Sequence, residues 1–238
     1  MENTALGYTA TADEKNKFLG RTYGWMGLAL LISAAAAFFS SHSLTLMRFL
    51  WGNRGLPFFA LVIAELALVW YLSASLRKLS MGTAVALFVA YSVVNGVTLS
   101  SVFIIFQTSS IACSFFASAA LFGAMSLYGF KTKANLASAG RYLLMAVLGL
   151  VIVSAVNMII TMITHRPLSW LDWLVSIATV VIFTGLTAYD SQKILRAAEH
   201  AENSETFQKL ALYGALDLYL DFINIFLSLL RLFGNRRN

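Results

Sequence analysis

Charged residues are scarce in this sequence. Asp, Glu, Lys and Arg make up 12% of its 238 residues, whereas 59% are apolar. A soluble domain carries about 25% charged and roughly 45–50% apolar residues, and a disordered chain needs low hydrophobicity with high charge. Both classes are therefore excluded. The composition predicts a membrane protein with several spans, since about 20 apolar residues suffice for one spanning helix.

Residues that ligate metals or form disulfides are equally few. The single cysteine, Cys113, cannot form an internal disulfide, and the three histidines all lie between apolar segments, so no zinc cluster is expected. The sequence has no G-x-S-x-G or Walker-type motif and no basic, aromatic-interleaved stretch of the kind that binds nucleic acid. We expect no cofactor, no enzymatic activity and no nucleic-acid partner. The net charge of +6 is assigned to basic cytoplasmic loops.

Proline is also rare, and neither proline interrupts an apolar run. Pro57 opens one segment and Pro167 precedes another, where a first-turn proline loses no helical hydrogen bond. The sequence predicts an all-α integral membrane protein, with a polar tail over residues 1–22 and one seven-helix domain over 23–234. The seven predicted spans are 23–40, 57–76, 82–106, 109–130, 142–163, 169–190 and 210–233.

Lysine and arginine are distributed unevenly between the two sides of this bundle. Eleven lie on the side of the N-terminus and three on the other side before the C-terminal tail, which predicts a cytoplasmic N-terminus. The last segment is expected to cross fully, although a re-entrant segment would keep Arg236 and Arg237 inside. The first segment is expected to be a retained helix rather than a cleaved signal peptide, because its polar lead is long and carries both charges.

We single out four acidic residues inside the predicted spans or at their ends, where an ionised side chain costs roughly 2.5–3.5 kcal/mol on insertion scales. They are Glu65, Asp190, Asp217 and Asp221. Because residues four apart share a helix face, Asp217 and Asp221 form one polar stripe with Asn224 and Ser228. Such a stripe must face protein or water rather than lipid, which predicts that the last helix lies at the centre of the bundle.

Asp190, at the end of the sixth span, can meet Asp217 or Asp221 on the cytoplasmic side. Two carboxylates a few ångströms apart do not both ionise cheaply, so the pair is predicted to titrate as a unit and to sense pH. Alternatively, Asp190 and Asp217 are solvated residues at helix ends. Glu65 is interpreted either as a structural residue or as part of a cation path. Arg77 either extends to the membrane surface or pairs with Asp190.

Several separated motifs resemble the Bax inhibitor-1 family, and the similarity covers nearly the whole chain. They lie at residues 185–194 (GLTAYDSQKI), 220–227 (LDFINIFL), 21–26 (RTYGWM) and 122–129 (FGAMSLYG). The short tail and loops resemble the bacterial inner-membrane branch. The resemblance implies a bundle of six helices around the last one, and a pH-sensitive Ca²⁺ leak gated by an aspartate pair.

By motif, that pair maps onto Asp190 and Asp221. The resemblance implies that the deprotonated pair opens the pore or binds Ca²⁺ transiently, and that a shared proton closes it. Asp217, Glu65 and Asn224 are candidates for the ion path. The family's arginine latch maps loosely onto Arg77.

Two alternative functions remain at this point. The resemblance also allows a regulator without transport that binds another membrane protein, such as a membrane AAA protease. Tyr189-Asp190 and Gly214-Ala215-Leu216-Asp217 are similar to the aspartate motifs of presenilin-type intramembrane proteases. The second of those motifs has glycine where this chain has Leu216, which argues against the protease.

Small residues recur at helical spacing within two of the predicted spans, where they allow helices to approach closely. They are Ser92, Gly96 and Ser100 in one span and Ala120 and Ala124 in the next. We interpret both stripes as internal packing rather than as a dimer face. The expected partners are therefore the lipid bilayer, Ca²⁺ and protons, with a monomer favoured over a dimer.

Overall fold

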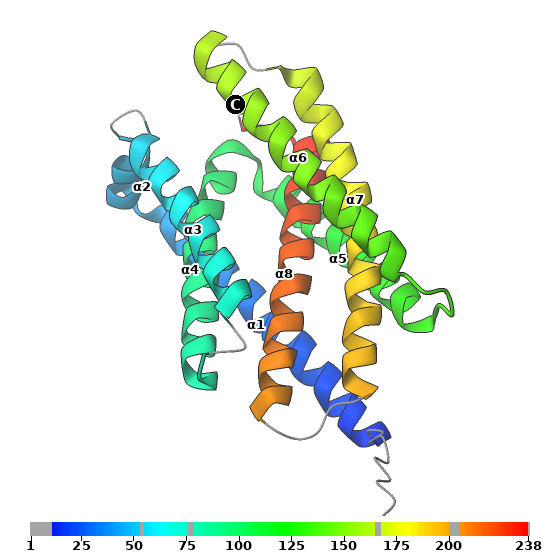
Figure 1. The fold of residues 1–238 in the computed structure, drawn as a ribbon. Helices are drawn as coiled ribbons and strands as arrows, with labels where there is room; N and C mark the ends of the chain where they lie inside the picture. The colour runs from blue at the N-terminus through cyan, green and yellow to red at the C-terminus, as the bar shows by residue number, and fades with distance from the viewer. Residues whose placement is uncertain (1–10, 53–54, 76–78, 165–167, 200–204, 238) are drawn as a thin grey trace, which may run out of the picture.

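The computed structural model describes residues 11–52, 55–75, 79–164, 168–199 and 205–237, which form eight helices in a bundle (Figure 1). Seven of these helices are long and apolar enough to cross a membrane, and the described residues include no β-strand. The chain is thus an all-helical membrane bundle. The helices are α1 (Ala12–His42), α2 (Leu44–Trp51), α3 (Leu56–Ser75), α4 (Met81–Ile105), α5 (Thr108–Lys131), α6 (Ala137–Thr164), α7 (Ser169–Glu199) and α8 (Glu205–Phe233).

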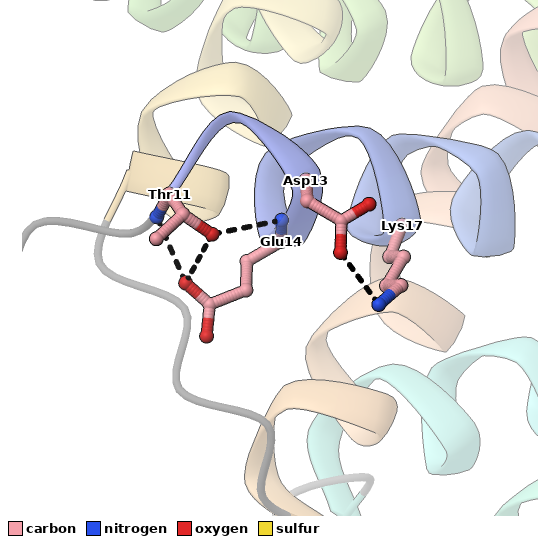
Figure 2. Close-up of polar contacts among 4 residues, drawn as sticks. All are labelled: Thr11, Asp13, Glu14 and Lys17. Carbon is pink, nitrogen blue, oxygen red and sulfur yellow. Dashed lines mark hydrogen bonds and ion pairs between the residues drawn. The ribbon is translucent and has the colours of Figure 1, made fainter.

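Helix α1 begins eleven residues before the first predicted span, so the expected polar tail is partly helical. A capping box starts the helix: the Thr11 hydroxyl accepts from the Glu14 backbone N–H, and the Glu14 carboxylate accepts from Thr11 (Figure 2). Asp13 and Lys17 form an exposed ion pair on the next turn (Figure 2). Phe18 is buried against Phe207 of α8, which anchors this extension to the bundle.

Helix α2 is absent from the predicted elements because its eight residues cannot satisfy a length test for spanning. The Ser43 side chain caps its N-terminus by accepting from the Leu46 backbone N–H. Phe49 is exposed, and the Trp51 ring stacks on Phe58 of α3. A short helix with exposed aromatic residues suits the membrane–water interface.

Several of the other helices extend beyond their predicted spans, since a hydropathy search finds the apolar stretch and misses the polar turns that continue it. Helix α6 begins at Ala137 rather than at 142, and α8 begins at Glu205 rather than at 210. Helix α7 continues to Glu199 rather than ending at 190. Asp190 is therefore an interior residue of α7, and its interpretation as a solvated helix end is wrong.

Helix α8 is the central helix of the bundle. In its apolar window 67% of the residues are buried, against 6% in α3 and in α6. It packs against α1, α4, α5 and α7, while α3 packs on α4 and α6 packs on α7 (Figure 1). The predicted central position is confirmed, but the implied ring of six helices is wrong, because α3 and α6 belong to an outer layer.

The C-terminal residues show that α8 crosses the whole bundle. Ser33 of α1 donates to the Ser92 carbonyl of α4, and Phe38 contacts Phe103 further along, so α1 and α4 run in the same direction. The end of α4 therefore lies on the other side of the bundle from the start of α1. The backbone N–H of Arg237 donates to the Ile105 carbonyl at this far end (2.8 Å). This arrangement supports the full crossing over the re-entrant alternative.

The two stripes of small residues have different environments. Ser92, Gly96 and Ser100 are buried, and a Cβ atom at Gly96 would lie 2.5 Å from the Ser33 carbonyl oxygen of α1. The internal packing predicted for this stripe is confirmed. Ala120 and Ala124 are exposed, so the same interpretation is wrong for them. The buried face of α5 instead consists of Ser110, Ser114, Ser118, Phe122, Ser126 and Gly129.

Candidate functional site

The contact between α7 and α8 brings Asp190 and Asp221 together inside the bundle. Asp190 is 8% exposed and Asp221 is 3% exposed. Asp190 lies near enough to interact electrostatically with Asp221, and the Thr187 hydroxyl, one turn before Asp190, also faces that carboxylate. The Asp221 Oδ2 atom has no hydrogen-bond partner among the described residues. An unpartnered carboxylate oxygen inside a membrane protein is costly and is suited to accept a proton or a cation.

Asp217 lies one turn before Asp221 on α8 and belongs to the same cluster. The Lys193 ammonium of α7 contacts both neighbouring acids, at 2.9 Å from Asp217 Oδ2 and 3.7 Å from Asp190 Oδ1. The Asp217 side chain is only 20% exposed, so it is not a freely solvated residue. An ammonium between Asp190 and Asp217 differs from the proton-sharing dyad of an aspartic protease and argues against that alternative.

A cluster of three hydroxyl groups adjoins Asp190, and the sequence analysis missed it. Tyr23 of α1, Ser126 of α5 and Ser191 of α7 lie within 3.0–3.2 Å of one another through their hydroxyl oxygens. Gly129 lets α5 approach this point, since a Cβ atom there would overlap the Ala188 carbonyl oxygen. All four residues lie within the motifs that resemble the Bax inhibitor-1 family, at residues 21–26, 122–129 and 185–194. Their place in these motifs was the signal by which the sequence could have indicated the cluster.

Gln192, the next residue of α7, fastens the connection between α5 and α6. Its Oε1 accepts from the Leu136 backbone N–H (3.0 Å), and its Nε2 donates to the Ala134 carbonyl (2.8 Å). Arg196 donates to Gln192 Oε1 and to Asn135 Oδ1. These bonds hold the loop between α5 and α6 against α7, the helix that carries Asp190. The distribution of lysine and arginine predicts that this loop lies on the cytoplasmic side.

Glu65 belongs to a different polar network. Its carboxylate accepts from the Asn95 amide of α4, and Asn95 Oδ1 accepts from the Tyr219 hydroxyl of α8 (2.8 Å). The Tyr219 oxygen also lies 2.7 Å from the Ser33 hydroxyl. The structure therefore joins Glu65 to α4 and α8 rather than to the aspartates. This network joins four helices, α1, α3, α4 and α8.

The remaining predicted residues have varied positions. Ser228 is buried as the polar stripe predicts, whereas Asn224 is partly buried and donates to the Leu220 carbonyl of its own helix (2.8 Å). Arg77, the candidate latch, lies outside the described residues. Asp172 was overlooked as an acid of the sixth span: it lies in the first turn of α7 and accepts from Asn157 (2.6 Å).

Aromatic side chains of α5 and α8 pack against one another on the C-terminal side of Asp221. Phe222 contacts Phe115 and Phe122 of α5, with ring centroids 5.3 and 5.8 Å apart, and Phe226 also contacts Phe115. An apolar cavity of about 320 Å³ lies beside them between α1, α4, α5 and α8. Apolar groups thus flank the acidic cluster on the C-terminal side of Asp221.

In the described part of the chain, no group of three or more His, Cys, Asp or Glu side chains converges on one point. Ca²⁺ prefers six to eight oxygen ligands, and Asp190, Asp221 and Thr187 provide fewer. A Ca²⁺ ion at this cluster would keep part of its water shell, as a passing ion does.

Comparison with known proteins gives similarity over most of the chain. Residues 15–238 match the family described as "Inhibitor of apoptosis-promoting Bax1". The chain is 45% identical to the inner membrane protein YbhL of Escherichia coli K12 over 227 residues, which cover 92% of each chain. It is 38% identical to a protein of Deinococcus radiodurans over 238 residues, covering 100% of this chain and 98% of the relative. A membrane protein of Streptococcus pyogenes serotype M1 is 33% identical, with 95% and 96% covered.

Proposed function

The chain belongs to the Bax inhibitor family of membrane proteins, and we propose that this multi-pass inner membrane protein is a pH-sensitive cation leak that conducts Ca²⁺. The observation that carries the proposal is the burial of Asp190 and Asp221 on the packed helices α7 and α8, near enough to interact electrostatically, with one oxygen of Asp221 left without a partner. Intramembrane acids are expensive and usually functional. The expected permeant ions are Ca²⁺ and protons, with no resident cofactor.

The gate in this proposal is the aspartate pair itself. With both carboxylates ionised, the pair carries two negative charges and offers the oxygen ligands that Ca²⁺ prefers. When the carboxylates share one proton, the pair loses a charge and gains a hydrogen bond between α7 and α8, which closes the path. Ca²⁺ flux therefore rises as the pH rises.

The path is expected to run from the α7–α8 connection to the aspartate pair. Asp217 lies one turn nearer that connection than Asp221 on the same helix. The N-terminus faces the cytoplasm in this proposal, so the polar side of the cluster is the cytoplasmic side. Beyond Asp221, opening is expected to separate Phe222 from Phe115 and Phe122, because these rings pack against one another between α8 and α5.

The other predicted residues have supporting places in the proposal. Glu65 holds α3 to α4 and α8 through Asn95 and affects the gate through the position of α8. Asn224 extends the stripe of Asp217 and Asp221 along α8. Arg77 remains a predicted latch toward Asp190.

The proposal is tested by Ca²⁺ flux into proteoliposomes that contain the wild type, Asp190→Asn, Asp221→Asn or the double variant. If the two acids form one sensor, each single variant removes most of the pH dependence, and the double variant adds little. Asp172→Asn is the matched control, because it makes the same change at the opposite end of α7. The proposal would be refuted if flux into wild-type proteoliposomes were no greater than into protein-free liposomes. It would also be refuted if Asp172→Asn changed the pH dependence as much as the three variants of the aspartate pair do.

The second candidate function is a regulator of another membrane protein, such as a membrane AAA protease. The observation that favours it is the outer layer of α3 and α6, whose largely unburied faces are available to lipid or to a partner. Deleting residues 1–10 separates the functions: loss of the cellular phenotype with unchanged flux would support the regulator.

A further inference from the structure

Lys193 places a positive charge inside the acidic cluster that is proposed to receive the permeant cation. Its ammonium lies 2.9 Å from Asp217 and 3.7 Å from Asp190. We propose, resting on the proposed cation leak, that Lys193 is a tethered competitor: its ammonium occupies part of the cation site and sets the Ca²⁺ concentration that the leak requires. Lys193 is thus a specificity-determining residue.

The order of the residues along the two helices supports this role. Helices α7 and α8 are antiparallel at this contact, since Ile194 packs beside Gly214 while Asp190 lies near Asp221. The pair of Lys193 and Asp217 therefore forms a layer between the inner aspartates and the α7–α8 connection. A cation that enters from that connection meets this layer first.

The exposure of the side chains indicates that the ammonium is displaceable. The Lys193 side chain is 42% exposed, whereas those of Asp217 and Asp190 are 20% and 11% exposed. The Tyr213 ring, one turn nearer the start of α8, lies 5.0 Å from the ammonium and offers it a favourable contact. A flexible lysine stem can thus leave the carboxylates without losing every partner.

With Lys193 counted, the charges of the cluster balance those of a divalent ion. Asp190, Asp217, Asp221 and Lys193 carry a formal net charge of minus two when all are ionised. With the ammonium withdrawn from the carboxylates, the acids meet the incoming cation unscreened. With the ammonium in place, Asp217 Oδ2 and Asp190 Oδ1 are already engaged, and the unpartnered Asp221 Oδ2 is one of the oxygens left to the cation.

A purely structural salt bridge would behave differently from a tethered competitor. Loss of a structural bridge lowers the thermal stability of the protein, but the half-saturating Ca²⁺ concentration stays the same. Loss of a competitor lowers that concentration, since the cation no longer displaces an ammonium. The two roles are therefore separated by the concentration dependence of flux rather than by its maximum.

The test measures Ca²⁺ flux against Ca²⁺ concentration in proteoliposomes at one neutral pH, for the wild type, Lys193→Met and Lys193→Arg. Lys193→Met keeps the length of the side chain and removes its charge. This variant is expected to lower the half-saturating Ca²⁺ concentration about tenfold or more, because Ca²⁺ no longer has to break an ion pair between unit charges about 4 Å apart near the protein surface. Lys193→Arg keeps the charge and is expected to stay within about twofold of the wild type.

A second variant protects the test against misfolding. If Lys193→Met does not fold, Lys193→Met combined with Asp217→Asn removes the pair without leaving an isolated buried charge, and is expected to lower the half-saturating concentration relative to Asp217→Asn alone. Wild-type flux with equal half-saturation in all variants would overturn the role of Lys193 and leave the leak intact. Absence of flux in the wild type would overturn both.

Discussion

The closest helix contact beside the candidate site depends on Gly129, and its replacement by alanine gives a quantitative prediction. An added Cβ atom would overlap the backbone carbonyl oxygen of Ala188 and would lie 3.0 Å from the Ser191 Cβ atom. A backbone carbonyl cannot move aside as a flexible side chain can. Gly129→Ala must therefore push α5 away from α7 at the turn that precedes Asp190.

The size of the effect follows from two opposed contributions. Overpacking of a tight interior costs about 1–3 kcal/mol, while replacing glycine by alanine within a helix contributes roughly 0.5–1 kcal/mol of stability. The expected net destabilisation of Gly129→Ala relative to the wild type lies between about 0 and about 2.5 kcal/mol. Gly123→Ala is the matched control, since it lies on the same helix and a Cβ atom there meets nothing within 4 Å.

Thermal unfolding in detergent, followed by intrinsic tryptophan fluorescence, measures both variants. Gly129→Ala is expected to unfold at a lower temperature than the wild type, and Gly123→Ala at the same or a higher temperature. A Gly129→Ala protein as stable as Gly123→Ala would refute the close approach of α5 and α7.

Two further predictions concern the interior of α8. Phe222→Ala removes the ring that packs on Phe115 and is expected to increase Ca²⁺ flux severalfold, whereas alanine at the exposed Phe233 leaves flux unchanged; equal flux in both variants would contradict the apolar closure. Tyr219→Phe removes the hydroxyl that donates to Asn95 and leaves the buried Asn95 Oδ1 atom without this donor. The variant is expected to lose about 1–3 kcal/mol of its free energy of unfolding, which is measured as a lower unfolding temperature. An unchanged unfolding temperature would contradict the hydrogen-bond network around Glu65.

The overall architecture was accessible from the sequence because the bilayer restricts the choices. Apolar runs of helical length in a chain with few charges admit a helical bundle and little else. The polar stripe that includes Asp221 and Ser228 predicted the central position of α8, since hydrocarbon cannot solvate it. The same argument could not find the helix ends, because polar turns such as those at Glu14 or Glu199 carry no hydropathy signal.

The candidate site was predicted only in part. The acids Asp190, Asp217 and Asp221 stood out because ionisable groups are rare inside spans. The ion pair of Asp217 with Lys193 was missed, since the two residues lie on different helices and 24 positions apart. The hydroxyl cluster around Tyr23 joins three helices, and no spacing within one segment reveals such contacts.

The measurement that tests the central claim most directly is the pH dependence of Ca²⁺ flux through the wild type and Asp221→Asn, at one Ca²⁺ concentration, between about pH 5 and pH 8. Asp221 is chosen because it is the most buried acid of the cluster and has an unpartnered oxygen. The account predicts flux that rises sigmoidally with pH in the wild type and little or no pH dependence in the variant. A variant whose flux follows the wild-type curve would contradict the aspartate gate.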